Sequence, residues 1–251
     1  MQLKKWLTLI KKILRKLILR FSSLYSNNKE SKVIFYHDIY VSHSECNTST
    51  SLDLFKKHLA CIANLGFEIV MDITNSTSQI KIQLDDGFSG IFEVYEFLEK
   101  NKIPIEIFII TSKIGEKGFL DKDQIKKMNE SDYVRFSSHT HTHADLSPIS
   151  KDSLKYELET SKILLEELLS SSVGAICYPR GIFSKEVIDR AKELGYKEQY
   201  SSLPGSFRSG INDKVFNRNL VQFCDTQELK YILKGGLAIF HKRYWRRHYK
   251  L

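Results

Sequence analysis

The sequence contains few cysteines, and their positions exclude a disulfide-stabilised fold. Its 251 residues include Cys46, Cys61, Cys177 and Cys224, and no two of these form a CxxC pair. Small domains that depend on disulfides carry cysteines at spacings that suggest a framework, and that pattern is absent here. We therefore interpret the four cysteines as reduced thiols, which favours a cytoplasmic protein.

Long hydrophobic runs are also missing, most informatively from residues 1–29. Lysine and arginine interrupt every apolar stretch there, which excludes a membrane span of about 20 residues and a signal-peptide core of about 7–15 residues. The apolar side chains instead recur at helical spacing: Leu3, Trp6, Leu7, Ile10, Ile13, Leu14, Leu17 and Phe21. This pattern predicts a basic amphipathic helix, with a polar linker at 22–32. The helix either lies in the interface of an anionic membrane or packs on the body or a partner.

Acidic residues are scarce at both ends of the chain. Residues 1–29 carry a net charge of +8 without a single acid, and residues 226–251 carry +6. Because the whole chain has a formal charge of +8, the body at 30–225 must carry −6. The C-terminal segment also interleaves aromatic with basic side chains, which suits lipid headgroups or single-stranded nucleic acid. The acidic body argues against nucleic acid. The predicted partner is therefore an anionic membrane surface that both basic ends contact.

The body, in which no repeat or low-complexity segment is visible, is long enough for one sizeable domain. Its hydrophobic pattern alternates between strand-like and helix-like runs. We predict strands at 32–36, 67–71, 79–84, 104–110, 133–136 and 174–177, and helices at 53–65, 90–100, 153–169 and 185–194. Such alternation predicts a parallel sheet covered by helices, either open or closed into a barrel.

Polar side chains cluster just after four of these strands. They are His37-Asp38 after the first strand, Asp85-Asp86 after 79–84, three histidines within 139–143, and Tyr178-Pro179 after 174–177. Folds of this class build their active sites at the carboxyl ends of parallel strands. We therefore expect the four clusters to form one site.

Asp85 and Asp86 are adjacent carboxylates that cannot both stay comfortably ionised without a nearby cation. One of them can bind a metal ion while the other remains free as a base. Gly87 completes Asp-Asp-Gly, which is also a common turn sequence, so the motif has a purely structural interpretation as well.

The three histidines offer a complementary set of ligands. His139 and His143 are four residues apart, so on a helical turn both rings would reach one ion, whereas His141 would point elsewhere. The alternative is a polar loop with solvated imidazoles. Two imidazoles and one carboxylate form a common catalytic metal set that leaves positions open for water and substrate. Asp86, His139 and His143 would supply that set, with Asp85 left as the base.

At this point the sequence resembles the polysaccharide deacetylases with a NodB-type domain, carbohydrate esterase family 4. QLDDGF resembles that family's Thr-Phe-Asp-Asp-Gly motif, SSHTHTHADLS its His-Ser/Thr-x-x-His motif, and CYPRG its Tyr-Pro-x-Gly motif. VIFYHDI resembles the Tyr-His segment of a subgroup that acts on poly-N-acetylglucosamine. The resemblance covers roughly 33–220. It implies a distorted (β/α) barrel and a metal-dependent N-deacetylase, with zinc as the expected ion.

The resemblance also implies roles for single residues. Asp85 would be the general base and Asp86, His139 and His143 the metal ligands, while a backbone N–H near Tyr178 and Pro179 would stabilise the oxyanion. His37 would serve as the acid, or it is a buried histidine that caps a strand. Arg218 would orient Asp85, or it is a surface cation.

The sequence departs from the family pattern in three places. Gln83-Leu84 stands where the family has Thr-Phe, and Arg180 follows Pro179 where an aromatic or variable residue is usual. A late Leu-x-Leu-x-His motif, which often supplies the acid, is not evident. These departures bear on the identity of the acid more than on the metal set.

The most favoured function is removal of the N-acetyl group from an N-acetylated sugar of a bacterial surface glycan or its lipid-linked precursor. O-acetyl ester hydrolysis at the same site and a non-catalytic glycan-binding module are the alternatives. We expect a basic amphipathic helix at 1–29, the deacetylase domain at 30–225 and a basic aromatic segment at 226–251. The lack of an export signal and the basic helix together predict the cytoplasmic face of a membrane.

Overall fold

A computed structural model describes residues 2–42, 44, 46–209 and 215–250. The strands of its main sheet are β1 Lys32–Tyr36, β4 Glu68–Ile69, β5 Gln79–Leu84, β6 Ile105–Ile109, β7 Val134–Ser138, β8 Ala175–Cys177, β10 Glu198–Tyr200, β11 Val215–Phe216 and β12 Asn219–Leu220. The helices are α1 Gln2–Ser26, α2 Leu52–Asn64, α3 Gly90–Asn101, α4 Lys122–Asn129, α5 Lys151–Leu169, α6 Lys185–Glu193, α7 Thr226–Leu233 and α8 His241–His248. Short pairs join β2 Asp38–Tyr40 to β3 Ser49–Ser51, and β9 Phe183–Ser184 to β13 Tyr249–Lys250.

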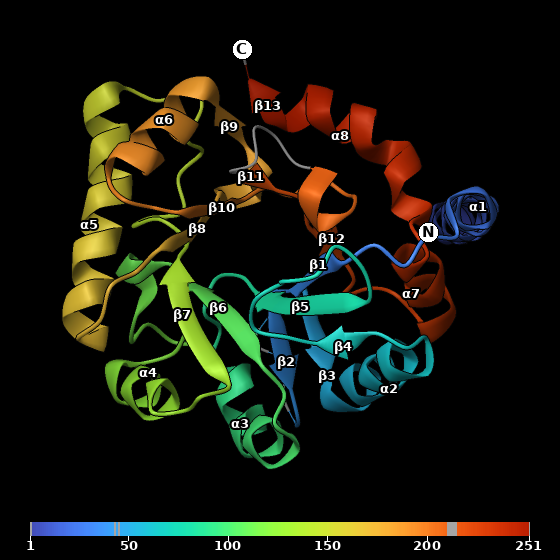
Figure 1. The fold of residues 1–251 in the computed structure, drawn as a ribbon, viewed down its shortest axis with the longest axis horizontal. Helices are drawn as coiled ribbons and strands as arrows, with labels where there is room; N and C mark the ends of the chain where they lie inside the picture. The colour runs from blue at the N-terminus through green and yellow to red at the C-terminus, as the bar shows by residue number, and fades with distance from the viewer. Residues whose placement is uncertain (1, 43, 45, 210–214, 251) are drawn as a thin grey trace.

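The main sheet is parallel and curls almost into a ring. Its strands follow the order β11-β10-β8-β7-β6-β5-β1-β12, with β4 paired to the start of β5. The two strands at the ends of this order, β11 and β12, are separated in sequence by only Asn217 and Arg218, so the edges of the sheet must approach each other. Figure 1 shows the strands around a centre with the helices outside. The predicted distorted (β/α) barrel is confirmed.

Local sequence explains where the elements begin and end. The hydroxyl of Ser51 accepts a hydrogen bond from the Leu54 N–H and caps α2, which ends just before Gly66 in the left-handed region (φ 72°). In β5, Ile80, Ile82 and Leu84 lie in the hydrophobic core. The polar residues between them are buried as well, because they point to the inside of the barrel.

The predicted strands and helices of the body all occur, but several bounds differ. The strand predicted at 67–71 is reduced to the two residues of β4. Helix α1 continues through residues 22–26, so the predicted linker is wrong over that stretch. Helix α4, which begins with a reciprocal cap between Asp121 and Gln124, was not predicted. Neither were the short strands β10–β12, which carry too few residues for a periodic signal.

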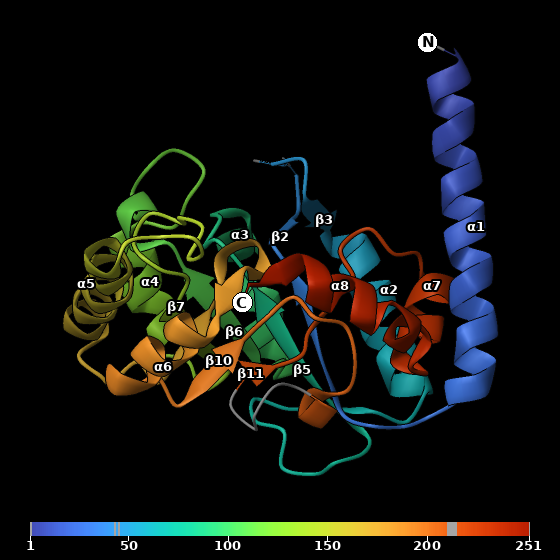
Figure 2. The same ribbon diagram turned by 90° about the horizontal axis from the view of Figure 1, so that it is seen from above.

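The two terminal segments pack against each other and against the body. Leu19 of α1 is fully buried. Lys16 and Arg15 form ion pairs with Asp225 (2.6 Å) and Glu228 (3.2 Å) beside α7. Figure 2 shows the N-terminal end of α1 projecting beyond the rest of the molecule. In the part of the chain that the structure describes, no helix is long and apolar enough to cross a membrane.

Helices α7 and α8 give the predicted C-terminal segment an ordered structure. The Asp225 carboxylate accepts a hydrogen bond from the Glu228 N–H and caps α7, so the helix begins at the boundary predicted between body and segment. Helix α8 is half-buried at Trp245, which packs on Tyr249 with the ring centroids 4.8 Å apart. Tyr249 in turn contacts Phe183. The segment therefore forms one wall beside the carboxyl edge of the barrel.

Candidate active site

The Asp85-Asp86 pair lies in a tight turn at the carboxyl end of β5. The Asp85 N–H still donates to the Tyr36 carbonyl (3.0 Å), which continues the pairing with β1. Asp86 (φ 74°) and Gly87 (φ 78°) then both adopt the left-handed region. The positive φ favours glycine at position 87, and a Cβ atom there would lie 2.7 Å from Ile109 Cδ1, so the end of that side chain would have to shift. The turn separates the two carboxylates and gives each a different set of neighbours.

The histidine-rich segment does not form the helical turn that the spacing predicted. Residues 139–143 follow β7 as an irregular bend, in which Thr140 (φ 67°) and His143 (φ 65°) are left-handed. This bend still brings the rings of His139 and His143 to a centroid distance of 5.0 Å. His141 points away, because its Nδ1 lies 2.8 Å from the Thr111 hydroxyl and its ring packs on Tyr156. The expected partners meet by a different local geometry.

Asp86, His139 and His143 form a candidate metal site. Asp86 Oδ1 lies 3.3 Å from His139 Nε2 and 3.5 Å from His143 Nε2. That oxygen is buried, and among the described residues it accepts no hydrogen bond of acceptable geometry. A divalent cation would satisfy the orphaned oxygen and both ring nitrogens at once. The residues present therefore fit a metal ion.

The surroundings orient the His139 ring and keep the His143 ring neutral. His139 Nδ1 lies 2.8 Å from the Cys177 carbonyl, which can only accept, so Nδ1 carries the proton and Nε2 faces Asp86. Burial and the neighbouring His139 lower the pKa of His143 to about 4, so this ring is neutral at pH 7. Burial opposes charge on His139 too, but Cys177 and Asp86 raise its pKa above the ordinary value. A metal ion would compete with that proton.

A second group of possible ligands, Asp85, His139 and Cys177, is less suitable. All three are buried. Both Asp85 oxygens already accept hydrogen bonds from Arg218, and burial raises the pKa of the Cys177 thiol, which keeps it protonated. The set that contains Asp86 is partly exposed, as a catalytic metal site requires.

Asp85 is paired with Arg218 inside the barrel. The two guanidinium nitrogens of Arg218 donate to the two carboxylate oxygens at 2.7 and 2.8 Å, and its Nε donates to the Ser201 carbonyl (2.9 Å). The guanidinium also lies over the Phe35 ring at 4.1 Å. Burial alone would raise the pKa of Asp85, but Arg218 holds it below its usual range, so Asp85 is ionised. Arg218 is 1% exposed and is not the surface cation of the alternative interpretation.

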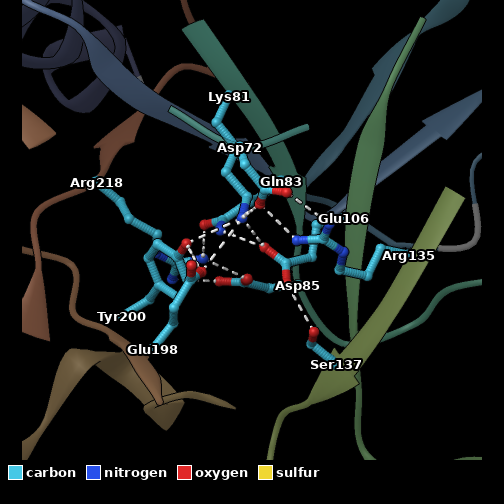
Figure 3. A network of polar contacts seen from close by, with 10 residues as sticks. All are labelled: Asp72, Lys81, Gln83, Asp85, Glu106, Arg135, Ser137, Glu198, Tyr200 and Arg218. Carbon is cyan, nitrogen blue, oxygen red and sulfur yellow. Dashed lines mark hydrogen bonds and ion pairs between the residues drawn. The ribbon is translucent and has the colours of Figure 1, made fainter. Parts of the chain in front are cut away.

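This ion pair continues into a polar network inside the barrel (Figure 3). Arg218 also reaches the Gln83 side chain (3.4 Å), whose amide donates to Glu106 (2.8 Å). Glu106 forms an ion pair with Lys81 at 2.9 Å. Gln83, which stands in place of the family's Thr, thus connects the site to the interior.

A pocket of about 290 Å³ opens over the two carboxylates. It is lined from the barrel by His37, Asp85, Asp86, His139, His143, Arg180, Ser202 and Arg218, and from the terminal segments by Arg15, Leu237, Tyr244 and His248. His37 is only partly buried, and its Nδ1 lies 2.5 Å from Gln222 Oε1. This placement leaves His37 at the pocket, where the predicted acid must be, and that role stays a prediction.

Tyr178 and Pro179 are not among the residues that line this pocket, and their predicted role at the oxyanion stays a prediction. The Tyr178 N–H donates to the Tyr200 carbonyl (3.0 Å), and its hydroxyl donates to Gln199 within the core. Pro179 has no N–H to offer. Arg180 (φ 54°) faces the pocket instead and pairs with Asp145 at 2.5 Å. Arg180 could have been noticed in the sequence, because it departs from the residue that usually follows the proline of the family motif.

The comparison of sequences decides the family. Residues 72–199 match the polysaccharide deacetylase family. The chain belongs to this family. Poly-β-1,6-N-acetyl-D-glucosamine N-deacetylase of Staphylococcus aureus is 29% identical over 154 residues, which are 56% of this chain and 53% of that protein. YxkH of Bacillus subtilis is 24% identical over 69% of this chain and 65% of its own length. The chain thus spans between half and two thirds of these relatives.

Solved structures of polysaccharide deacetylases share the fold. One from Bacillus cereus superposes with a TM-score of 0.72 at 24% identity, covering 82% of this chain and 69% of its own. A Streptococcus pyogenes deacetylase, solved in complex with acetate, gives a TM-score of 0.70 at 22% identity and covers 82% of this chain and 99% of its own. At these identities the likeness concerns the fold.

Proposed function

We propose that this polysaccharide deacetylase family member is a metal-dependent N-deacetylase of an N-acetylated glycan, with zinc as its ion. The observation that carries the proposal is the orphaned Asp86 oxygen between His139 and His143, beside a second carboxylate that is kept ionised. A divalent cation bound there would polarise an amide carbonyl and lower the pKa of a water molecule. The relative from Staphylococcus aureus, named for N-deacetylation of poly-β-1,6-N-acetyl-D-glucosamine, supports the choice of substrate class.

The side chains of this site divide the remaining chemistry between them. Asp85, ionised and oriented by Arg218, takes a proton from the attacking water as the water oxygen bonds to the carbonyl carbon. The carbon–nitrogen bond then breaks, and the leaving nitrogen takes up a proton, for which we propose His37 as the donor. The products are acetate and a free amine on the sugar. The predicted location on the cytoplasmic face of a membrane stays a prediction.

Acetate release from N-acetylglucosamine oligomers and from O-acetylated sugars tests this proposal. We expect chelator-sensitive release from the amides, restored by Zn²⁺, and a fall of about 10³-fold in kcat/KM for Asp85→Asn. Glu193→Gln, a change on an exposed surface, serves as the control. Faster release from the esters would instead favour the esterase, and Zn²⁺ binding without release from either class would favour a glycan-binding module.

A further inference from the structure

A second pocket adjoins the candidate active site. It has a volume of about 430 Å³ and lies between α1 and α8. Arg15, Leu237, Tyr244 and His248 line both this pocket and the one over Asp85, so the two are neighbours. Its other lining residues are Lys11, Leu14, Ile18, Phe240, Arg243 and Arg247. We call this second pocket the α1–α8 groove.

The α1–α8 groove combines free cations with an apolar wall. Lys11, Arg243 and Arg247 are exposed, and in the described part of the chain none of the three forms an ion pair with a carboxylate. Among the residues that the structure describes, no acidic one lines the groove. Leu14 and Ile18 supply hydrocarbon beside these charges. Arginine and lysine bind phosphate oxygens strongly, and the apolar wall suits a hydrocarbon chain attached to that phosphate.

Helix α1 presents a further apolar face to solvent. The exposed side chains recur at spacings of three or four residues: Trp6, Ile10, Ile13, Leu17, Phe21 and Leu24, each at least 43% exposed. Leu14, which is 56% exposed, lies beside this stripe and also lines the groove, whereas Leu19 is buried. An exposed apolar stripe flanked by cations is the pattern of a helix that enters the interface of an anionic bilayer. The helix therefore offers an apolar face to a membrane, and that face borders the groove at Leu14.

We propose, on the basis of the proposed deacetylase function, that the substrate is an N-acetylated sugar carried on a lipid phosphate. The α1 stripe enters an anionic bilayer, Arg243 and Arg247 bind the phosphate, and the lipid follows the apolar wall of the groove. The sugar then reaches the adjoining pocket over Asp85. A glycan polymer without phosphate would leave the groove cations without a ligand.

Helix α8 itself provides matched variants for the test. Arg243→Gln with Arg247→Gln removes two groove cations four residues apart. Lys242→Gln with Arg246→Gln removes the same charge at the same spacing, from exposed positions that do not line the groove. Thermal unfolding of both proteins first establishes that they are equally folded.

The first measurement is substrate preference. Acetate release is followed from N-acetylglucosamine joined by diphosphate to a short prenyl chain, in anionic vesicles, and from a soluble N-acetylglucosamine oligomer. We expect the ratio of kcat/KM for the prenyl-linked to the soluble substrate to fall about tenfold in the groove variant and to stay unchanged in the control. Equal ratios in the two variants, or a wild type that prefers the soluble oligomer, would overturn this proposal and leave the deacetylase function intact.

The second measurement is binding without catalysis. Prenyl diphosphate and inorganic pyrophosphate, neither of which carries a sugar, are titrated into the protein by calorimetry. We expect prenyl diphosphate to bind about tenfold more tightly than pyrophosphate, and only the groove variant to lose that binding. Equal affinity for the two would indicate a free-phosphate site and refute the lipid. If neither sugar substrate releases acetate, the deacetylase function fails, while this titration still reports on the groove.

Discussion

Buried carboxylates lie at both ends of the barrel interior, but the two ends differ in the hydrogen-bond partners that they offer. In the amino-terminal half, every oxygen of Glu106 has a partner: Ser137 donates to one, and Gln83 and Lys81 to the other. At the carboxyl edge, Asp86 has an oxygen that accepts no well-formed hydrogen bond from the described residues. Both carboxyl groups are therefore costly to bury, but only one has its cost offset by the chain itself.

This difference separates a structural network from a candidate binding site. A closed set such as Lys81 and Glu106 holds strands β5 and β6 in register and offers no free ligand atom. An open set such as Asp86 with His139 and His143 is incomplete until a cation arrives. Asp85 stands between the two, because Arg218 satisfies both its oxygens while the carboxylate still faces the pocket. Arg218 keeps Asp85 ionised whether or not a cation is bound, which suits a base rather than a ligand.

The closed network predicts the largest effect on stability. Lys81→Met leaves Glu106 as a buried charge without its cation, and we expect the free energy of unfolding to fall by about 3–5 kcal/mol. Lys81→Met combined with Glu106→Gln removes both charges and should recover most of that loss. Urea denaturation of the three proteins at pH 7 measures this. A double variant as unstable as the single one would show that the pair does not act as a closed unit.

The open site predicts a smaller effect that depends on metal. Zn²⁺ at about 100 times its dissociation constant should raise the free energy of unfolding of the wild type by about 2.7 kcal/mol, because it binds only the folded protein. Asp86→Asn should lose this increment, and chelator should remove it. Lys81→Met, although destabilised, should keep it. The comparison of the two ends breaks down if Zn²⁺ stabilises Asp86→Asn as much as the wild type.

The two regions differ in how far the sequence predicts them, because they differ in the sequence patterns that they contain. The strand-end positions of Asp85, Asp86 and His139 were sufficient to place the site, because chain order and a parallel sheet bring strand ends together. The left-handed residues that direct His143 have no periodic signal. Arg218 lies 133 residues from Asp85, so its burial could be inferred only through the family resemblance. In this region sequence predicts which residues meet, but not how.

The amino-terminal network was invisible for a different reason. Lys81 and Gln83 alternate with isoleucines, a pattern that also describes a strand with one face in solvent. Only closure of the sheet turns that polar face inward, and closure depends on the short strands β11 and β12, which have no periodicity of their own. A polar alternation in a barrel therefore has to be interpreted after the topology is known.

Lys32, at the start of β1, provides the smallest and most specific test, because it is a buried charge whose hydrogen-bond partners are neutral. Its ammonium donates to Asn28 Oδ1 (2.8 Å) and the Glu30 carbonyl (2.7 Å), and burial lowers its pKa to about 8. Between about pH 8 and 10.5 the unfolded chain binds more protons than the folded one, so stability should rise with pH in that window. Between pH 7 and about 9.5, the free energy of unfolding of the wild type should gain on the order of 1–2 kcal/mol from this group. Lys32→Gln should not show that gain.

Urea denaturation of both proteins at the two pH values isolates this contribution, because all other titrating groups are shared. Burial lowers the pKa of Lys81, but the neighbouring carboxylates, chiefly Glu106, together raise it by more, so the pKa lies above its ordinary value. Its charge is therefore retained through the same window, and a Lys81→Met protein should show the wild-type rise. If the free energies of unfolding of Lys32→Gln and the wild type differ by the same amount at both pH values, Lys32 keeps its charge through this window as Lys81 does. The distinction between a buried charge with an ionic partner and one with only neutral partners would then not hold at this end of the barrel.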